Sequence, residues 1–65
     1  MHRRVILPRG ARVRVAVGQW RGHVGATLDD ALSTTQRIAV AVEVDGHQWQ
    51  IHPLVYELEP IEEAS

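Results

Sequence analysis

Two segments of this chain place apolar residues at every second position, and this pattern constrains the fold more than any other feature of the sequence. In residues 12–17 the alternate positions from Val13 onward are all valine, and in residues 37–44 Ile38 is followed by valine at every second position. A period of two carried by β-branched residues is typical of a β-strand with one buried face. The sequence therefore predicts strands over residues 12–17 and 37–44.

Three further short strands follow from weaker alternation. Residues 24–28 alternate after a glycine-rich loop, residues 48–52 alternate up to Pro53, and residues 56–60 alternate near the end of the chain. Proline ends the fourth strand because it has no backbone donor. The order of predicted elements is thus five strands without a predicted helix.

Turn signals separate these strands. Asp45-Gly46 lies between two strands and predicts a hairpin, because a type I′ turn needs positive φ at both of its central residues. Residues 29–35 are polar and turn-prone, and a single 3₁₀ turn is expected at Leu54 and Val55.

A chain of 65 residues without cysteine must fold as one small domain on its apolar pattern alone. A flat sheet of five strands would leave one face bare, so we expect closure into an all-β, small five-stranded SH3-like barrel. The barrel is predicted over residues 12–60, after a basic N-terminal lead-in (1–11) and before an acidic tail (61–65). The predicted inward-facing side chains are Val13, Val15, Val17, Val24, Leu28, Ile38, Val40, Val42, Trp49, Ile51 and Leu58.

Charge is divided unevenly along the chain. Residues 1–25 hold six arginines and no acid, and residues 26–65 hold one arginine and eight acids. One interpretation is a basic strip, containing Arg12 and Arg14, that binds phosphate or another anion. The alternative is that the last strand pairs with the first and sets Glu57 and Glu59 against these arginines. The net charge of −1 argues against tight, sequence-independent binding of nucleic acid.

Three glycines lie between the first two predicted strands. Gly18 is expected to leave the first strand with positive φ, and Gly22 to close the loop. Gly25, inside the second strand, would permit a bulge or the close approach of another backbone. Such spacing suits a tight corner between two strands at a barrel rim.

The segment 13–28, VRVAVGQWRGHVGATL, resembles a KOW motif. KOW domains are similar to SH3-like barrels and occur in ribosomal proteins and transcription elongation factors, where the loop side of the motif contacts RNA or protein. Carried over position by position, the resemblance implies a contact loop made of Gln19, Trp20, Arg21 and His23.

The two tryptophans receive different interpretations. Trp20, in the glycine-bounded loop, is either a stacking platform or interaction anchor, or a lid folded back over the barrel mouth. Trp49 shares a strand face with Ile51, which predicts core packing. Tyr56 could join Trp20 around a cation, but such a cage usually needs three or more converging aromatic side chains, and the chain has three aromatic residues in all.

Catalytic, cofactor and metal chemistry find no support in the sequence. The four histidines lack metal-site spacing, and no paired nucleophile and base or phosphate-binding loop occurs. No apolar run of about 18 residues exists, so we expect no membrane span. Lack of cysteine and of an apolar leader predicts a cytoplasmic location.

The predicted function is therefore a non-enzymatic binding module. RNA or a ribonucleoprotein would contact Arg12, Arg14 and the loop residues Gln19, Trp20, Arg21 and His23. The alternative is a protein–protein adaptor, in which the same loop or an exposed edge strand docks on a partner protein or on a second copy of the chain.

Overall fold

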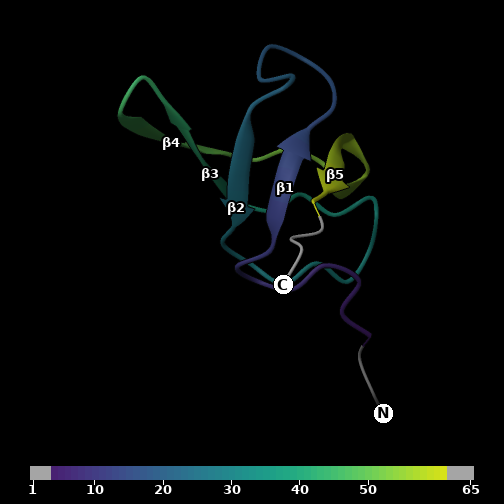
Figure 1. The fold of residues 1–65 in the computed structure, drawn as a ribbon. Helices are drawn as coiled ribbons and strands as arrows, with labels where there is room; N and C mark the ends of the chain where they lie inside the picture. Colours follow the sequence, from purple (N-terminus) through teal and green to yellow (C-terminus); the bar gives the residue numbers. More distant parts are fainter. Residues whose placement is uncertain (1–3, 62–65) are drawn as a thin grey trace.

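The computed structural model describes residues 4–61, and in this range the chain forms five strands and one 3₁₀ turn (Figure 1). The turn, η1 (Val55–Glu57), directly precedes the last strand. The strands are β1 (Arg12–Val15), β2 (Val24–Thr27), β3 (Val40–Val44), β4 (His47–Ile51) and β5 (Leu58–Pro60). The all-β fold that the alternation predicts is confirmed. No helix in residues 4–61 has the length and apolar character needed to cross a membrane.

All five strands belong to one antiparallel sheet in the order β4-β3-β2-β1-β5. Outside the ladder, the Ile38 N–H donates to the Pro53 carbonyl at 3.2 Å, and the Val55 N–H donates to the Gln36 carbonyl at 2.9 Å. These bonds hold the chain that follows β4 against the chain that precedes β3, so the sheet curls around its buried face. The strand order, with a 3₁₀ turn before β5, is that of a small SH3-like barrel.

The β3–β4 hairpin has the predicted turn. Asp45 has φ of 50° and Gly46 has φ of 80°, and Val44 and His47 face each other across the turn. Asp45 is the one non-glycine residue with positive φ among those described. In Figure 1 the hairpin lies at the left, β1 and β2 stand in the middle, and β5 with η1 lies at the right.

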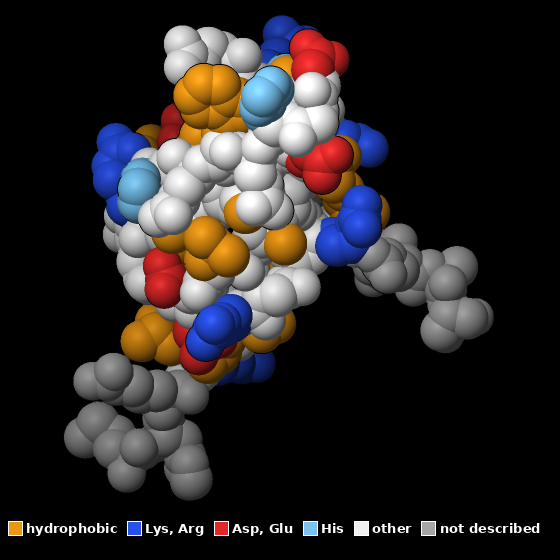
Figure 2. Space-filling model, turned by 90° about the vertical axis from the view of Figure 1, so that its left-hand side faces the viewer, with side chains coloured by type: hydrophobic (Ala, Val, Ile, Leu, Met, Phe, Trp, Pro, Cys, Tyr) orange, Lys and Arg blue, Asp and Glu red, His pale blue; other side chains and the backbone are white. Residues whose placement is uncertain are grey.

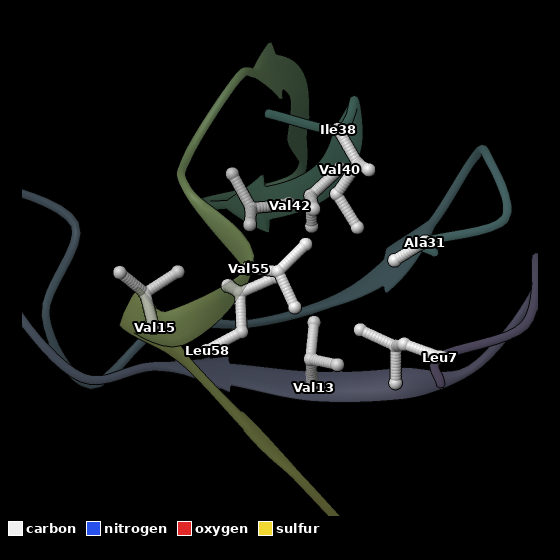
Figure 3. Close-up of a cluster of buried hydrophobic side chains, with 9 residues drawn as sticks. All are labelled: Leu7, Val13, Val15, Ala31, Ile38, Val40, Val42, Val55 and Leu58. Atoms are coloured by element: carbon white, nitrogen blue, oxygen red, sulfur yellow. The ribbon is translucent and has the colours of Figure 1, made fainter. Parts of the chain in front are cut away.

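The core is a single cluster of nine buried side chains between the curled sheet and its connecting segments (Figure 3). Six of them were expected from the alternation: Val13, Val15, Ile38, Val40, Val42 and Leu58. The other three, Leu7, Ala31 and Val55, lie outside the strands. Leu7 and Ala31 form an isolated bridge, and the Ala31 N–H donates to the Leu7 carbonyl at 2.7 Å.

The predicted inward face of β2 is wrong. Val13 pairs with Gly25, so Gly25 and Thr27 face the core, and Val24 is only partly buried on the outer face. Thr27 is 1% exposed, whereas Leu28, which we expected inside, is 37% exposed. The Thr27 hydroxyl tolerates burial because it donates to the Pro8 carbonyl (2.7 Å) and accepts from the Ala11 N–H (3.0 Å).

Two further core predictions are wrong. Val17 is 48% exposed because β1 ends at Val15, two residues before the predicted end. Trp49 is 53% exposed, although it pairs with the buried Val42 and therefore lies on the predicted face of β4. Trp49 lies outside the nine-residue core, toward the edge of the sheet that β4 forms.

Candidate functional site

The loop between β1 and β2 (residues 16–23) is held in place by backbone hydrogen bonds. Gly18 and Gly22 have φ of 82° and 87°, a left-handed conformation that glycine adopts without steric cost. The Arg21 N–H donates to the Gly18 carbonyl at 3.1 Å, and the Gly22 N–H donates to the Val15 carbonyl at 2.8 Å. Gly18 and Gly22 thus supply the two bends between which Gln19, Trp20 and Arg21 are presented.

His23 fixes the end of the loop on Trp20. Its backbone N–H donates to the Trp20 carbonyl at 3.0 Å, and its Nδ1 lies 3.1 Å from the same oxygen. A carbonyl oxygen only accepts, so Nδ1 carries the proton in this contact. The imidazole also meets the indole edge-on, with ring centroids 5.9 Å apart and planes at 78°. His23 therefore supports the loop and the orientation of Trp20 together.

Trp20 lies back over the core and is only partly buried. This is the arrangement that the lid interpretation describes. Its ring centroid is 6.0 Å from that of Trp49, with the planes tilted by 49°. The contact joins the loop to β4, two segments that are 29 positions apart in the sequence.

Two hollows adjoin Trp20. The larger, of about 350 Å³, is lined by Gln19, Trp20, His23, Val44 and Trp49; we call it the tryptophan hollow. The second, of about 260 Å³, shares Gln19 and Trp20 and reaches Ile51 and His52 at the end of β4. Three of the predicted contact residues, Gln19, Trp20 and His23, therefore meet in one place, together with Val44 and Trp49.

The predicted arginines lie elsewhere. Arg12 and Arg14 are exposed on the outer face of β1, opposite Ala26 and Val24, whereas Trp20 packs on the core side. Arg14 also lies opposite Glu59 in β5. On the face shown in Figure 2 the basic side chains are spread around the surface instead of forming one patch. Arg21 alone among the predicted arginines is a neighbour of Trp20 in the loop, and it is exposed.

One of the two acids that the charge-pairing alternative sets against these arginines has another role. The Glu57 Oε1 accepts from the Leu54 N–H at 2.9 Å and so closes η1. The β1–β5 pairing itself agrees with the charge-pairing interpretation. Residues 62–65 of the predicted acidic tail, and residues 1–3 of the predicted basic lead-in, lie outside the described residues.

Gly25 has a purely steric role in β2. A Cβ at this position would collide with the Ala41 carbonyl oxygen and would lie 2.8 Å from Val42 Cγ1. The absence of a side chain therefore allows β2 and β3 to approach, and β3 carries two of the fully buried core valines.

Sequence reasoning missed the contribution of β4 to this surface. Trp49 was expected inside, and Val44 was not expected beside it. The signal that could have found them is the predicted hairpin, which places Val44 and His47 across from each other and Trp49 close to the turn. Within residues 4–61, no group of three or more His, Asp or Glu side chains is positioned to hold a metal ion.

In comparisons with known proteins, no family model, no curated protein and no solved structure matches the chain.

Proposed function

We propose that this chain is a non-enzymatic binding module that docks on a partner protein by taking one of the partner's apolar side chains into the tryptophan hollow. The single observation that carries this proposal is the pair of tryptophans at its wall. Trp20 is fixed on the core, and Trp49 keeps 53% of its surface exposed. Tryptophan is among the residues most enriched at the energetic centres of protein interfaces.

The loop's rigidity supports binding at this place. The backbone bonds at Gly22 and His23, and the contact between Trp20 and Trp49, already fix the loop without a ligand. A partner would then have little loop entropy to remove on docking, which favours affinity. Trp49 adds a large apolar surface on a short strand whose backbone is fixed by β3.

RNA is the second candidate. It is supported by the KOW resemblance of residues 13–28 and by Arg21, an exposed guanidinium next to a tryptophan in the loop. Phosphate contacts and base stacking act together only when they share a surface. The separation of Arg12 and Arg14 from Trp20 therefore favours a protein partner over RNA.

We also propose a cytoplasmic location for this module, as the absence of cysteine predicts.

Selection from a random peptide library tests the protein-binding proposal. Peptides enriched on the wild-type protein should contain an apolar anchor residue and should bind Trp49→Ala at least about ten-fold more weakly, the loss typical of a central interface tryptophan. Tyr56→Ala is the matched control, because Tyr56 is 63% exposed and does not line the tryptophan hollow. Equal binding to the wild type and to Trp49→Ala would refute the proposal.

A parallel titration with single-stranded RNA separates the second candidate. RNA binding would weaken steeply with added salt and would be reduced by Arg21→Glu. Tight, salt-dependent binding of RNA, with no enriched peptide sensitive to Trp49→Ala, would replace the protein partner with RNA.

A further inference from the structure

One edge of the sheet lacks every feature that usually prevents strands from pairing between molecules. Natural edge strands are protected by charged side chains, by proline, by bulges or by being very short. β5 has such protection, because it is three residues long, contains Glu59 and ends at Pro60. β4 spans five residues, HQWQI, and four of the five are exposed. It contains no Asp, Glu, Lys, Arg or Pro.

The hairpin geometry determines which backbone groups of β4 face the open edge. The two-residue turn makes Val44 and His47 a hydrogen-bonded pair, and bonded and non-bonded pairs alternate along an antiparallel ladder. Trp49, opposite Val42, therefore directs its N–H and C=O toward β3. Gln48 and Gln50 direct theirs away from the sheet.

We propose that the chain forms a symmetric dimer in which β4 pairs antiparallel with β4 of a second copy, centred on Trp49. In this register Gln48 of each copy lies opposite Gln50 of the other, and each of these pairs exchanges two backbone hydrogen bonds. Trp49 lies opposite Trp49 of the second copy as the non-bonded central pair, where side chains approach most closely. The two curled sheets become one continuous ten-stranded sheet.

The self-complementary sequence of β4 identifies a second copy as the occupant. A two-fold axis brings identical surfaces together, so any charge on the strand would meet a charge of the same sign nearby. The strand instead presents glutamine on its outer face and tryptophan on its core side. Gln48 and Gln50 side-chain amides can donate to each other and accept from each other across the axis.

This dimer goes beyond the proposed function, and although the two Trp49 side chains meet in it, its hydrogen bonds come from other groups. Edge pairing depends on the backbone of Gln48 and Gln50, whereas the tryptophan hollow depends on the side chains of Trp20 and Trp49. A peptide selected on the hollow should keep its affinity for a variant with a blocked edge. Failure of either proposal therefore leaves the other intact.

Sedimentation equilibrium over a range of concentrations tests the dimer. Five-residue strands give a small interface, so dissociation constants between about 10 µM and 1 mM are expected. The wild type should rise from the 7.3 kDa monomer mass to twice that mass across this range. A monomer mass at every concentration up to about 1 mM would overturn the proposal.

Two variants locate the contact on β4. Gln50→Pro removes one outward N–H without removing a bond to β3, and the double variant Gln48→Lys/Gln50→Lys sets like charges face to face. Each should remain at 7.3 kDa under conditions in which the wild type dimerises. Gln50→Thr is the matched control, because it keeps the N–H and the strand preference and should still dimerise. Circular dichroism verifies folding, and dimerisation of the folded double variant at wild-type strength would refute the interface.

Cysteine pairing tests the register, since the chain has no cysteine of its own. A mixture of Gln48→Cys and Gln50→Cys chains should form a mixed disulfide on oxidation, because directly opposed Cα atoms lie about 5.5 Å apart. Either variant alone should crosslink poorly, because its two cysteines would be diagonal neighbours about 7–8 Å apart. Efficient crosslinking of each variant with itself, and not of the mixture, would exclude this register.

Discussion

Replacing Gly25 with alanine tests the packing of β2 against β3 most directly. The added Cβ would collide with the Ala41 carbonyl oxygen and would lie 2.8 Å from Val42 Cγ1. The first neighbour is backbone in a paired strand, so it can move only if the ladder between Gly25 and Val42 opens. The φ of Gly25 is not positive, so backbone strain is not the cause of the expected effect.

The magnitude follows from two opposing effects. Overpacking a closely packed site costs about 1–3 kcal/mol, and the backbone neighbour places Gly25→Ala near the upper value. Alanine reduces the entropy of the unfolded chain, which offsets about 0.4–1 kcal/mol. The net loss is about 2 kcal/mol, a large part of the roughly 3–10 kcal/mol available to a chain of this size. The melting temperature should fall by about 8–16 °C.

Thermal and urea unfolding, followed by circular dichroism, measure this loss. Gly18 provides the matched control, since it has φ of 82° and a Cβ added there would meet nothing within 4 Å. At Gly18, asparagine should be tolerated better than alanine, because asparagine accepts the left-handed conformation. At Gly25 the order should reverse, because the larger side chain clashes more. A Gly25→Ala protein as stable as the wild type would refute the argument that close approach requires this glycine.

Three other substitutions have defined expected outcomes. Thr27→Val should lower the free energy of unfolding by about 1–3 kcal/mol, because a buried hydroxyl with two backbone hydrogen bonds is lost, whereas Thr27→Ser should lower it less. Urea unfolding compares the two variants, and the opposite order of stability would contradict this role of the hydroxyl. Gly46→Ala should cost about 1–2 kcal/mol, because its φ of 80° is unfavourable for a residue with a Cβ; an unchanged urea midpoint would argue against the type I′ turn. Trp20→Ala should destabilise the protein more than Trp49→Ala, since only Trp20 packs on the core, and equal midpoints for the two variants would contradict this difference.

Local sequence determined the hairpin and the strand faces where the alternation was regular. Asp45-Gly46 fixed the turn because few dipeptides accept positive φ twice, and the alternation around Val13 and Val40 left only one face to bury. In β2 the alternation indicated the wrong face, because Val24 and Leu28 are more hydrophobic than Thr27. The inward face was decided instead by the register with β1 and by the Pro8 carbonyl, which lies 19 positions earlier in the chain.

How deeply a side chain is buried was harder to predict than which face of its strand it lies on. Trp49 lies on the predicted face, yet a period-two pattern does not say where along a strand the core ends. Leu7 and Ala31 are buried through a bridge between two irregular segments, and no periodicity marks such segments. The same limit applies to the candidate site, because a glycine-bounded loop predicts that Trp20 is presented but not which strand it meets.

The size of the core explains why the two tryptophans have different roles. Nine side chains form the buried cluster within residues 4–61, and four of them (Leu7, Ala31, Ile38 and Val55) lie outside the strands. This core is small, so an indole in a loop gains more by covering it than by standing in solvent. Trp20 therefore contributes to the stability of the fold. A loss of binding in Trp20→Ala would combine the effect of unfolding with the effect of losing a contact to the partner. Trp49 projects from a strand that β3 already holds, and much of its surface is still exposed in the folded protein. A partner that binds here thus gains most of its new apolar contact from Trp49, which makes this residue the discriminating position for the docking experiment.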